Sequence, residues 1–284
     1  MIKHVTICGS GTMGRGIAQV SAQYGYHTHL YDVSQEQLDN AYQSIHKNLS
    51  IGVDKGKTTI EEKEQCLSHL TLHTSLEEAC VDCDLFIEAI PEQLPLKHAL
   101  FTEVETYVSQ ACILGTNTSS LSIAEVAKPL SHPQRLIGTH FFNPVHIMKL
   151  LEIVYHEGTS QEVISAVQGF GSSIQKECIL VRNAPGFATS RLGVALGMEA
   201  IRMLEEGVAS AEDIDKAMVL GYRHPIGPLK LTDLVGLDVR MAIGSYLSEA
   251  LHNDAFSPPE LMKKMVSEGK LGAKSGIGFY EYNK

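Results

Sequence analysis

The stretch Ile2-Lys3-His4-Val5-Thr6-Ile7-Cys8-Gly9-Ser10-Gly11-Thr12-Met13-Gly14 decides the fold of this chain. Its first part predicts a short buried strand, and its last part is a G-x-G-x-x-G pattern. The residues from Arg15 to Tyr24 then favour a helix. Glycines in such a pattern permit a tight turn and let a pyrophosphate approach the backbone, while the N-terminus of the helix offers it free N–H groups. The stretch therefore predicts a strand, a loop and a helix that together bind a dinucleotide.

A second predicted strand, Thr28 to Tyr31, leads directly into Asp32. Asp32 follows Gly14 by 18 residues (32 − 14), close to the ~20 that are typical of an acid that binds the adenosine ribose hydroxyls. A carboxylate at this position would repel a 2′-phosphate, and no arginine follows it, so the sequence favours NAD over NADP. The alternative is the same fold with another ligand, or with none.

Further short strands alternate with helical segments, which predicts an α/β Rossmann-type fold with a doubly wound, mostly parallel sheet. In such sheets, ligands bind at the carboxyl ends of the strands. Polar residues follow predicted strands in this way at Glu92, at Asn117 to Ser120 and at His140. Helix capping would also explain Ser119 and Ser120, but their clustering with the other strand-end residues favours a site. The further predicted strands are Leu70–Thr74, Leu85–Ile87, Ile113–Gly115 and Ile179–Val181.

The segment from His140 to Glu152 is the candidate for the chemistry. An apolar run leads into His140, Asn143-Pro144 breaks it, and a second apolar run, Met148 to Val154, carries Glu152. If both runs are strands joined by a loop, the two side chains can face each other. A carboxylate that binds one imidazole nitrogen fixes the tautomer, so the other nitrogen can act as an acid or base. The alternative is a core histidine and an edge-strand glutamate.

The pattern changes after Asn183-Ala184-Pro185-Gly186-Phe187, because only helices are predicted beyond it. We expect two domains: residues 1–184, which bind the nucleotide, and residues 185–284, a smaller all-α C-terminal domain. Its apolar residues would pack partly against the first domain and partly against a partner subunit. The predicted helices are Ala188–Glu206, one from Ser210 to Gly221, Leu231–His252 with a weak point at Gly236, and one that starts at Ser257-Pro258-Pro259.

Composition excludes several classes of protein. The formal net charge is −10, so non-specific nucleic-acid binding is not expected, and an anionic substrate would need a local basic cluster. Lys55 and Lys57 offer one such cluster, although a solvated surface is the usual explanation of such a run. Cys80 and Cys83 form a lone C-x-x-C, and without a second pair we expect no metal site.

The six cysteines are scattered, which predicts free thiols in a reducing compartment. The chain shows no signal peptide and no run of apolar residues long enough for a membrane span. We therefore expect a cytoplasmic protein that does not bind a membrane.

Taken together, these motifs resemble the short-chain L-3-hydroxyacyl-CoA dehydrogenases, including the 3-hydroxybutyryl-CoA dehydrogenases, over essentially the whole chain. No single motif would be specific, but the set is. The motifs are Gly9–Gly14, Glu88-Ala89-Ile90-Pro91-Glu92, Asn117-Thr118-Ser119-Ser120-Leu121, His140-Phe141-Phe142-Asn143-Pro144, Pro185-Gly186-Phe187 and the closing Gly272–Tyr280.

The resemblance implies an NAD-dependent interconversion of an L-3-hydroxyacyl-CoA and a 3-ketoacyl-CoA by a homodimer that forms through the helical domain. It implies His140 as the catalytic acid/base, Glu152 as its orienting partner and Ser119 as a contact of the substrate oxygen. The implied cofactor-binding residues are Gly9, Gly11, Thr12, Met13, Gly14, Asp32, Glu92, Lys97, Asn117 and Asn143. The implied substrate-binding residues are Ser119, Asn143, Lys55 and Lys57.

One position departs from the family pattern. Many members carry asparagine in Pro-Gly-Phe-x-x-Asn-Arg, where it is an active-site hydrogen-bonding residue, and this chain has Ser190 before Arg191. A serine is shorter and has one donor in place of two, so substrate positioning or chain-length preference would differ.

Two other classes of protein remain to be weighed. Two-domain dehydrogenases of the 6-phosphogluconate or 3-hydroxyisobutyrate type use a lysine on the long helix after the nucleotide domain. No lysine occurs here between Asn183 and Asp215, which argues against them. A non-catalytic NAD-binding scaffold is the second alternative. The His140–Glu152 pair argues against it, and Ser190 leaves it open.

Overall fold

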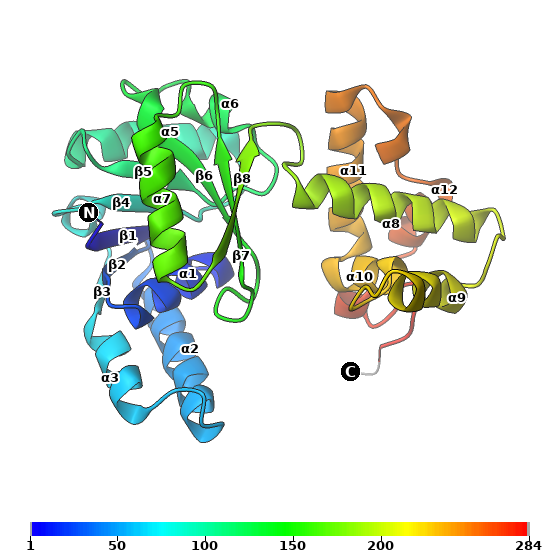
Figure 1. Cartoon of the computed structure of the whole chain (residues 1–284), viewed down its shortest axis with the longest axis horizontal. Helices are drawn as coiled ribbons and strands as arrows, with labels where there is room; N and C mark the ends of the chain where they lie inside the picture. The colour runs from blue at the N-terminus through cyan, green and yellow to red at the C-terminus, as the bar shows by residue number, and fades with distance from the viewer. Residues whose placement is uncertain (1, 283–284) are drawn as a thin grey trace. The chain divides into compact units, whose positions relative to one another are not determined.

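The structure is a computed structural model that describes residues 2–282. The chain divides into two compact units between Asn183 and Ala184 (Figure 1). The first unit contains one eight-stranded sheet, in the order β3-β2-β1-β4-β5-β6-β7-β8. The strands are β1 (His4–Cys8), β2 (His27–Tyr31), β3 (Leu70–His73), β4 (Leu85–Glu88), β5 (Ile113–Thr116), β6 (Leu136–Phe141), β7 (Leu150–Tyr155) and β8 (Glu177–Arg182).

Every neighbouring pair of strands is parallel except β6 and β7, which are antiparallel. The expected doubly wound, mostly parallel α/β sheet is therefore confirmed. The exception arises because β6 and β7 are joined by a short loop, whereas parallel neighbours need a crossover.

Helices cover both faces of this sheet, so most of its strands are buried. On one face, α1 and α2 pack with α7 against side chains such as Ile7 and Leu30. On the other face, Phe101 of α5 meets Phe86 of β4 edge to face, with ring centroids 6.1 Å apart. The helices of the first unit are α1 (Thr12–Gln23), α2 (Gln35–Asp54), α3 (Ile60–Ser68), α4 (Leu76–Ala79), α5 (Leu94–Tyr107), α6 (Ile123–Ala127) and α7 (Gln161–Ser173).

The second unit packs five α-helices around its own apolar core, which includes Met198, Leu229 and Leu247. Ser210 caps the second of them, because its side chain accepts a hydrogen bond from the backbone N–H of Asp213. The helices are α8 (Thr189–Glu205), α9 (Ala211–Lys216), which continues as a π-helix over Ala217–Gly221, α10 (Pro228–Val235), α11 (Leu237–Leu251) and α12 (Glu260–Ser267).

The single helix predicted over Leu231–His252 is wrong. Two helices occupy this segment, because Gly236 adopts φ 102° and ψ 127°, a conformation that ends α10 and starts α11. Glycine takes up such a positive φ without the steric cost that a side chain would add. The sequence marked the position as weak but not as a break.

A cluster of five histidines, four on β1 to β3 and one directly before β3, lies on the face of the sheet that also carries Thr6. The rings of His29 and His73 stack 5.0 Å apart, with Nδ1 of the former 2.8 Å from Nε2 of the latter. Burial lowers the pKa of His29, and the neighbouring imidazoles lower it further, while Asp82 opposes the shift. The members of the cluster are His4, His27, His29, His69 and His73.

This cluster predicts a loss of stability in mild acid. The pKa of His29 in the folded state lies below its ordinary value of 6.5, so the unfolded chain binds the proton first. Neutral His29 therefore contributes to the free energy of unfolding above pH 6.5, and this contribution is lost as the pH falls towards the folded-state pKa. Urea titrations from about pH 7.5 to about 5.5 should show a shallower decline for His29→Asn than for the unaltered chain. Equal slopes in the two proteins would contradict this.

Candidate active site

The glycine loop between β1 and α1 has the shape that a pyrophosphate needs. Gly9 has φ +99°, and a Cβ there would lie 2.7 Å from the carbonyl oxygen of Ala89. A Cβ on Gly14 would overlap the carbonyl oxygen of Gly9. At Gly11, by contrast, a Cβ would meet no atom within 4 Å. No side chain caps α1, and its first turn carries no acidic residue, so this loop fits an anion held by backbone N–H groups.

Asp32 stands beside this loop, directly after the end of β2. Its Oδ2 accepts hydrogen bonds from the backbone N–H and the hydroxyl of Ser10, at 2.9 and 2.7 Å. Its Oδ1 accepts from the backbone N–H of Ser34 at 3.1 Å. The carboxylate is thus fixed in place next to the glycines.

His140 and Glu152 are direct partners in the antiparallel ladder of β6 and β7. Nδ1 of His140 lies 2.8 Å from Oε2 of Glu152. Glu152 is fully buried, and the exposed fraction of His140 is 7%. The ring of Phe142 lies against the imidazole, with centroids 4.4 Å apart. The expected pairing is therefore present, and the carboxylate sits where it stabilises a positive charge on the ring.

One cavity of about 330 Å³ brings the dinucleotide loop and the histidine together. Met13 of the loop and His140 both line it, as do Asn117 and Ser119 from the end of β5. Asn117 ties the neighbouring strand to this edge, because its Oδ1 accepts from the backbone N–H of Phe141 at 2.9 Å. The remaining residues around the cavity are Ala89, Ile90, Glu92 and Phe141.

Glu92 organises the loop that follows β5. Its Oε1 accepts four hydrogen bonds, from the Thr118 hydroxyl, the Ser119 backbone N–H, and the backbone N–H and hydroxyl of Ser120, at 2.5 to 3.1 Å. Burial tends to raise the pKa of Glu92, but Lys97 and the Thr118 hydroxyl outweigh it and lower the pKa. An ionised Glu92 therefore holds Ser119 at the wall of the cavity.

Lys97 is buried behind Glu92, with an exposed fraction of 1%. Its Nζ lies 2.5 Å from Oε1 of Glu88 and 3.2 Å from Oε2 of Glu92. Glu88 is fully buried and also accepts from the Thr116 hydroxyl at 2.6 Å. Any effect of Lys97 at the cofactor therefore passes through these carboxylates. The sequence placed Glu88 in a motif but predicted no role for it. The signal for an ion pair was the presence of two acidic residues, Glu88 and Glu92, close to Lys97 in the sequence.

The lysines expected to meet the substrate lie at a second cavity. Lys55 ends α2, Lys57 follows it, and both are exposed. They line a cavity of about 420 Å³ together with His146 and Ile147 from the loop between β6 and β7. The same loop carries Asn143, which is exposed. Ser190 lies in the second unit, in the first turn of α8.

Neither a metal centre nor a membrane span emerges from residues 2–282. No group of three or more metal-ligating side chains converges in this part of the chain. None of its helices combines the length and the apolar character that crossing a bilayer requires.

A dinucleotide loop and an imidazole–carboxylate pair at one cavity define a class of protein, the nicotinamide-dependent dehydrogenases. Comparison with known proteins narrows this class. The family model for the 3-hydroxyacyl-CoA dehydrogenase NAD binding domain matches residues 4–184, and that for the 3-hydroxyacyl-CoA dehydrogenase C-terminal domain matches residues 186–282. The chain belongs to the 3-hydroxyacyl-CoA dehydrogenase family and uses NAD. The resemblance drawn from its motifs is confirmed.

Individual relatives match over their full length. A 3-hydroxybutyryl-CoA dehydrogenase of Clostridioides difficile is 41% identical over 280 residues, which cover 99% of each chain. A probable 3-hydroxybutyryl-CoA dehydrogenase of Bacillus subtilis is 38% identical over 283 residues, which cover 100% of this chain and 98% of the relative. The crystal structure of an (S)-3-hydroxybutyryl-CoA dehydrogenase from Ralstonia eutropha covers 100% of both chains, with a TM-score of 0.97 and 37% identity.

The buried position of Lys97 predicts a large loss of stability when its charge is removed. Lys97→Met leaves the carboxylates of Glu88 and Glu92 without their cation, which should cost about 3–5 kcal/mol in the free energy of unfolding. The double variant Glu88→Gln/Lys97→Met should lose less, because one buried charge is removed with its partner. Denaturant titrations measure both values.

Lys128→Met supplies the matched control, because Lys128 pairs with Glu125 at 2.7 Å on the surface. Its loss should cost less than about 1 kcal/mol. A Lys97→Met protein as stable as this control would contradict the role given to the buried ammonium group.

Proposed function

We propose that the protein interconverts an L-3-hydroxyacyl-CoA and the corresponding 3-ketoacyl-CoA, with a short acyl chain such as that of acetoacetyl-CoA. The observation that carries this proposal is the His140–Glu152 pair, 2.8 Å apart, at the cavity that the dinucleotide loop also lines. The names of the relatives support the CoA thioester as the substrate class.

The residues that would hold NAD are those of the glycine loop, with Asp32 at the ribose hydroxyls. The backbone N–H groups at the start of α1 would bind the pyrophosphate, since no side chain caps them. When bound, NAD supplies the hydride acceptor for oxidation, and its reduced form supplies the donor for reduction. Asn117 and Glu92 line the same cavity and are proposed to border the cofactor.

His140 moves the proton. In oxidation its Nε2 takes the proton of the C3 hydroxyl, and in reduction the imidazolium returns a proton to the keto oxygen. Glu152 holds Nδ1, so it fixes the orientation of the ring and stabilises the imidazolium that forms. General acid–base catalysis of this kind contributes about 10²–10⁴ in rate.

Ser119 is proposed to donate a hydrogen bond to the C3 oxygen, where negative charge develops. Its position at the cavity wall depends on Glu92, which binds its backbone N–H at 3.0 Å. Ser190 and Asn143 are proposed as further substrate contacts. Ser190 rests on the resemblance, because it fills the slot of an active-site asparagine in many family members.

Lys55 and Lys57 are proposed to bind the phosphates of CoA. The whole chain carries a formal charge of −10, so attraction of an anionic thioester must come from a local cluster. The cavity of about 420 Å³ that both lysines line supports this placement.

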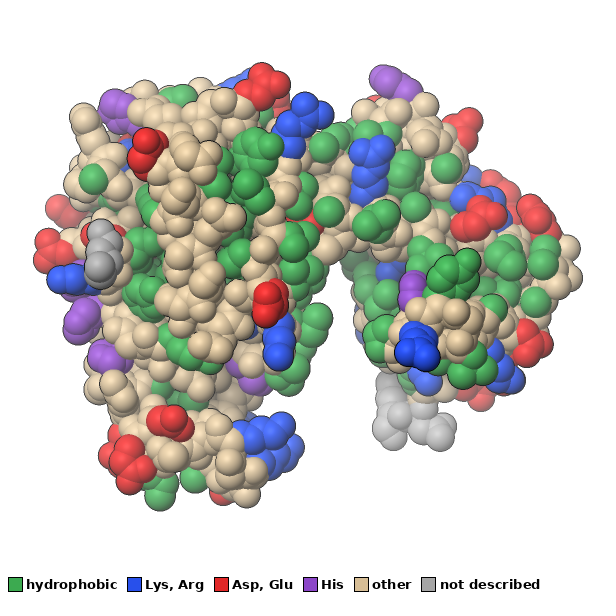
Figure 2. Space-filling model, viewed as in Figure 1, with side chains coloured by type: hydrophobic (Ala, Val, Ile, Leu, Met, Phe, Trp, Pro, Cys, Tyr) green, Lys and Arg blue, Asp and Glu red, His purple; other side chains and the backbone are tan. Residues whose placement is uncertain are grey.

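The helical unit is proposed to form a homodimer. Leu192, Leu220 and Tyr222 are each more than 70% exposed, and Figure 2 shows hydrophobic side chains on the surface of this unit. Apolar surface of this kind marks protein contacts. Sedimentation equilibrium should give twice the chain mass of 31.0 kDa, and a monomer at micromolar concentration would refute the proposal.

The compartment is proposed to be a reducing one such as the cytoplasm, and the six free thiols support this.

The test of this function follows NADH oxidation by absorbance with acetoacetyl-CoA as substrate. The unaltered protein should turn over acetoacetyl-CoA and not free acetoacetate. His140→Gln should keep NADH binding but lose most turnover, about 10²-fold or more, because the proton donor is gone. Measurable NADH binding without turnover in the unaltered protein would favour a scaffold instead. Turnover of free acetoacetate would favour a dehydrogenase of another substrate class.

A contrasting variant separates binding from chemistry. Lys55→Met/Lys57→Met should raise KM for acetoacetyl-CoA and leave kcat nearly unchanged, because the lysines contribute binding energy away from the reacting carbon. The opposite pattern, a lower kcat at unchanged KM, would rule out the phosphate-binding role.

A further inference from the structure

Three cysteines gather near the starts of β4 and β5, at the ends of these strands away from Glu88 and Thr116. The sequence shows the C-x-x-C pair Cys80 and Cys83, to which neither the fold nor the proposed function gives a role. The structure adds Cys112, whose Sγ lies 3.7 Å from Sγ of Cys83. The two meet because β4 and β5 are parallel neighbours, with Leu85 paired to Ile113. The C-x-x-C motif would suggest Cys80 as the partner of Cys83, whereas the structure shows a sulfur contact with Cys112.

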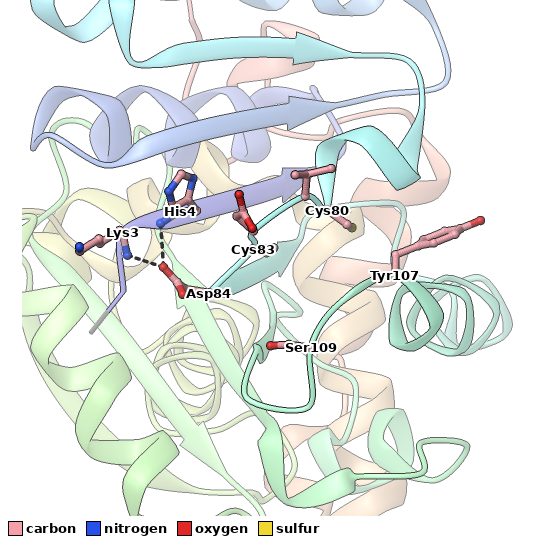
Figure 3. Close-up of a pocket in the computed structure, with 9 residues that line it drawn as sticks. Lys3, His4, Cys80, Cys83, Asp84, Tyr107 and Ser109 are labelled. Carbon is pink, nitrogen blue, oxygen red and sulfur yellow. Dashed lines mark hydrogen bonds between the residues drawn. The ribbon is translucent and has the colours of Figure 1, made fainter.

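A cavity of about 740 Å³ borders Cys83, whose exposed fraction is 5%. Figure 3 shows Cys83 and Cys80 among the residues that line it, beside Asp84, which binds the backbone N–H groups of Lys3 and His4. Cys112 does not line the cavity, and its exposed fraction is 1%. Of the two residues, only Cys83 lies next to the cavity.

The chemistry of the two thiols is unequal. The S–H of Cys112 donates to Sγ of Cys83, and this bond lowers the pKa of the Cys83 thiol in spite of its burial. The same contact, together with burial, raises the pKa of Cys112. Burial alone raises the pKa of Cys66 to about 12, and burial with nearby negative charge raises that of Cys80 to about 12. Since the thiolate is the reactive form, Cys83 is the favoured nucleophile.

We propose that Cys83 and Cys112 are a redox modification site, at which a hydroperoxide converts the thiol pair into a reversible intramolecular disulfide. The Cys83 thiolate attacks one peroxide oxygen, the O–O bond breaks, and a sulfenic acid forms as hydroxide leaves. Cys112 then attacks the Cys83 sulfur, an S–S bond replaces the S–O bond, and the proton of Cys112 leaves with the hydroxide as water. In sum, two thiols are oxidised and one hydrogen peroxide is reduced to two waters.

The geometry allows this bond with a small displacement. The sulfur atoms must approach by about 1.7 Å, from 3.7 Å to the ~2.05 Å of a disulfide. Both side chains lie just before adjacent strands, so their rotation would supply a movement of this size while the pairing of Leu85–Glu88 with β5 stays in register. The bridge would therefore form within the folded chain.

The experiment treats the reduced, full-length protein with hydrogen peroxide, blocks the remaining thiols with an alkylating agent and maps the peptides by mass spectrometry. Digestion with trypsin and with a protease that cuts before aspartate separates Cys80 from Cys83, because Asp82 lies between them. We expect a Cys83–Cys112 cross-link, loss of two of the six thiols, and full recovery after dithiothreitol. Retention of all six thiols, or a Cys80–Cys83 cross-link, would overturn the proposal.

Two variants sharpen the result. Cys80→Ser is the matched control, because Cys80 lines the same cavity, and it should form the cross-link as the unaltered protein does. Cys112→Ala removes the second thiol, so dimedone should label Cys83 as a trapped sulfenic acid. If Cys112→Ala does not fold, the peptide map of the unaltered protein decides the question alone. Labelling at Cys80 in place of Cys83 would also refute the assignment.

Discussion

The buried ammonium group of Lys97 holds the edge of the sheet at which the catalytic cavity lies. It neutralises Glu88 at the end of β4 and Glu92 just beyond it. Glu88 is fully buried, and a buried carboxylate without a cation would become neutral or destabilise the fold, so Glu88 depends on this contact. Glu88 in turn binds Thr116 of β5, and Glu92 binds the loop that carries Ser119. The loop next to the histidine is therefore held through Glu92, whose partly exposed carboxylate pairs with the buried ammonium group.

The reversal of direction at β7 supplies the partner of His140. A parallel strand after β6 would have started at the opposite edge of the sheet, because parallel neighbours need a crossover. The short antiparallel return places Glu152 directly beside His140 in the ladder. Full burial of Glu152 then strengthens its interaction with the imidazole, since few water molecules compete for the carboxylate. A single short loop thus produces the pair on which the proposed proton transfer depends.

The agreement between sequence and structure is best where the signal is local. The glycine loop, Asp32 and the strand ends are each recognised from a few adjacent residues, and the structure places them at one edge of the sheet. The prediction of a single helix over Leu231–His252 was wrong because the neighbouring sequence does not distinguish a glycine inside a helix from one that ends it. The positive φ of Gly236 separates α10 from α11. The histidine cluster was not predicted, because its members lie on three strands and at the end of α3, and these segments become adjacent only after the sheet has formed.

The sequence by itself determined the class of fold and the cofactor, and it predicted that His140 and Glu152 would face each other. Glycine spacing and apolar periodicity act within one or two elements, where backbone sterics and burial decide the conformation. Only the tertiary structure decided which side chains share a contact across elements. It buried Lys97 between two acids, and it brought Cys112 to Cys83 from a position 29 residues later in the chain. Such contacts depend on strand order and register, which no local run of residues encodes.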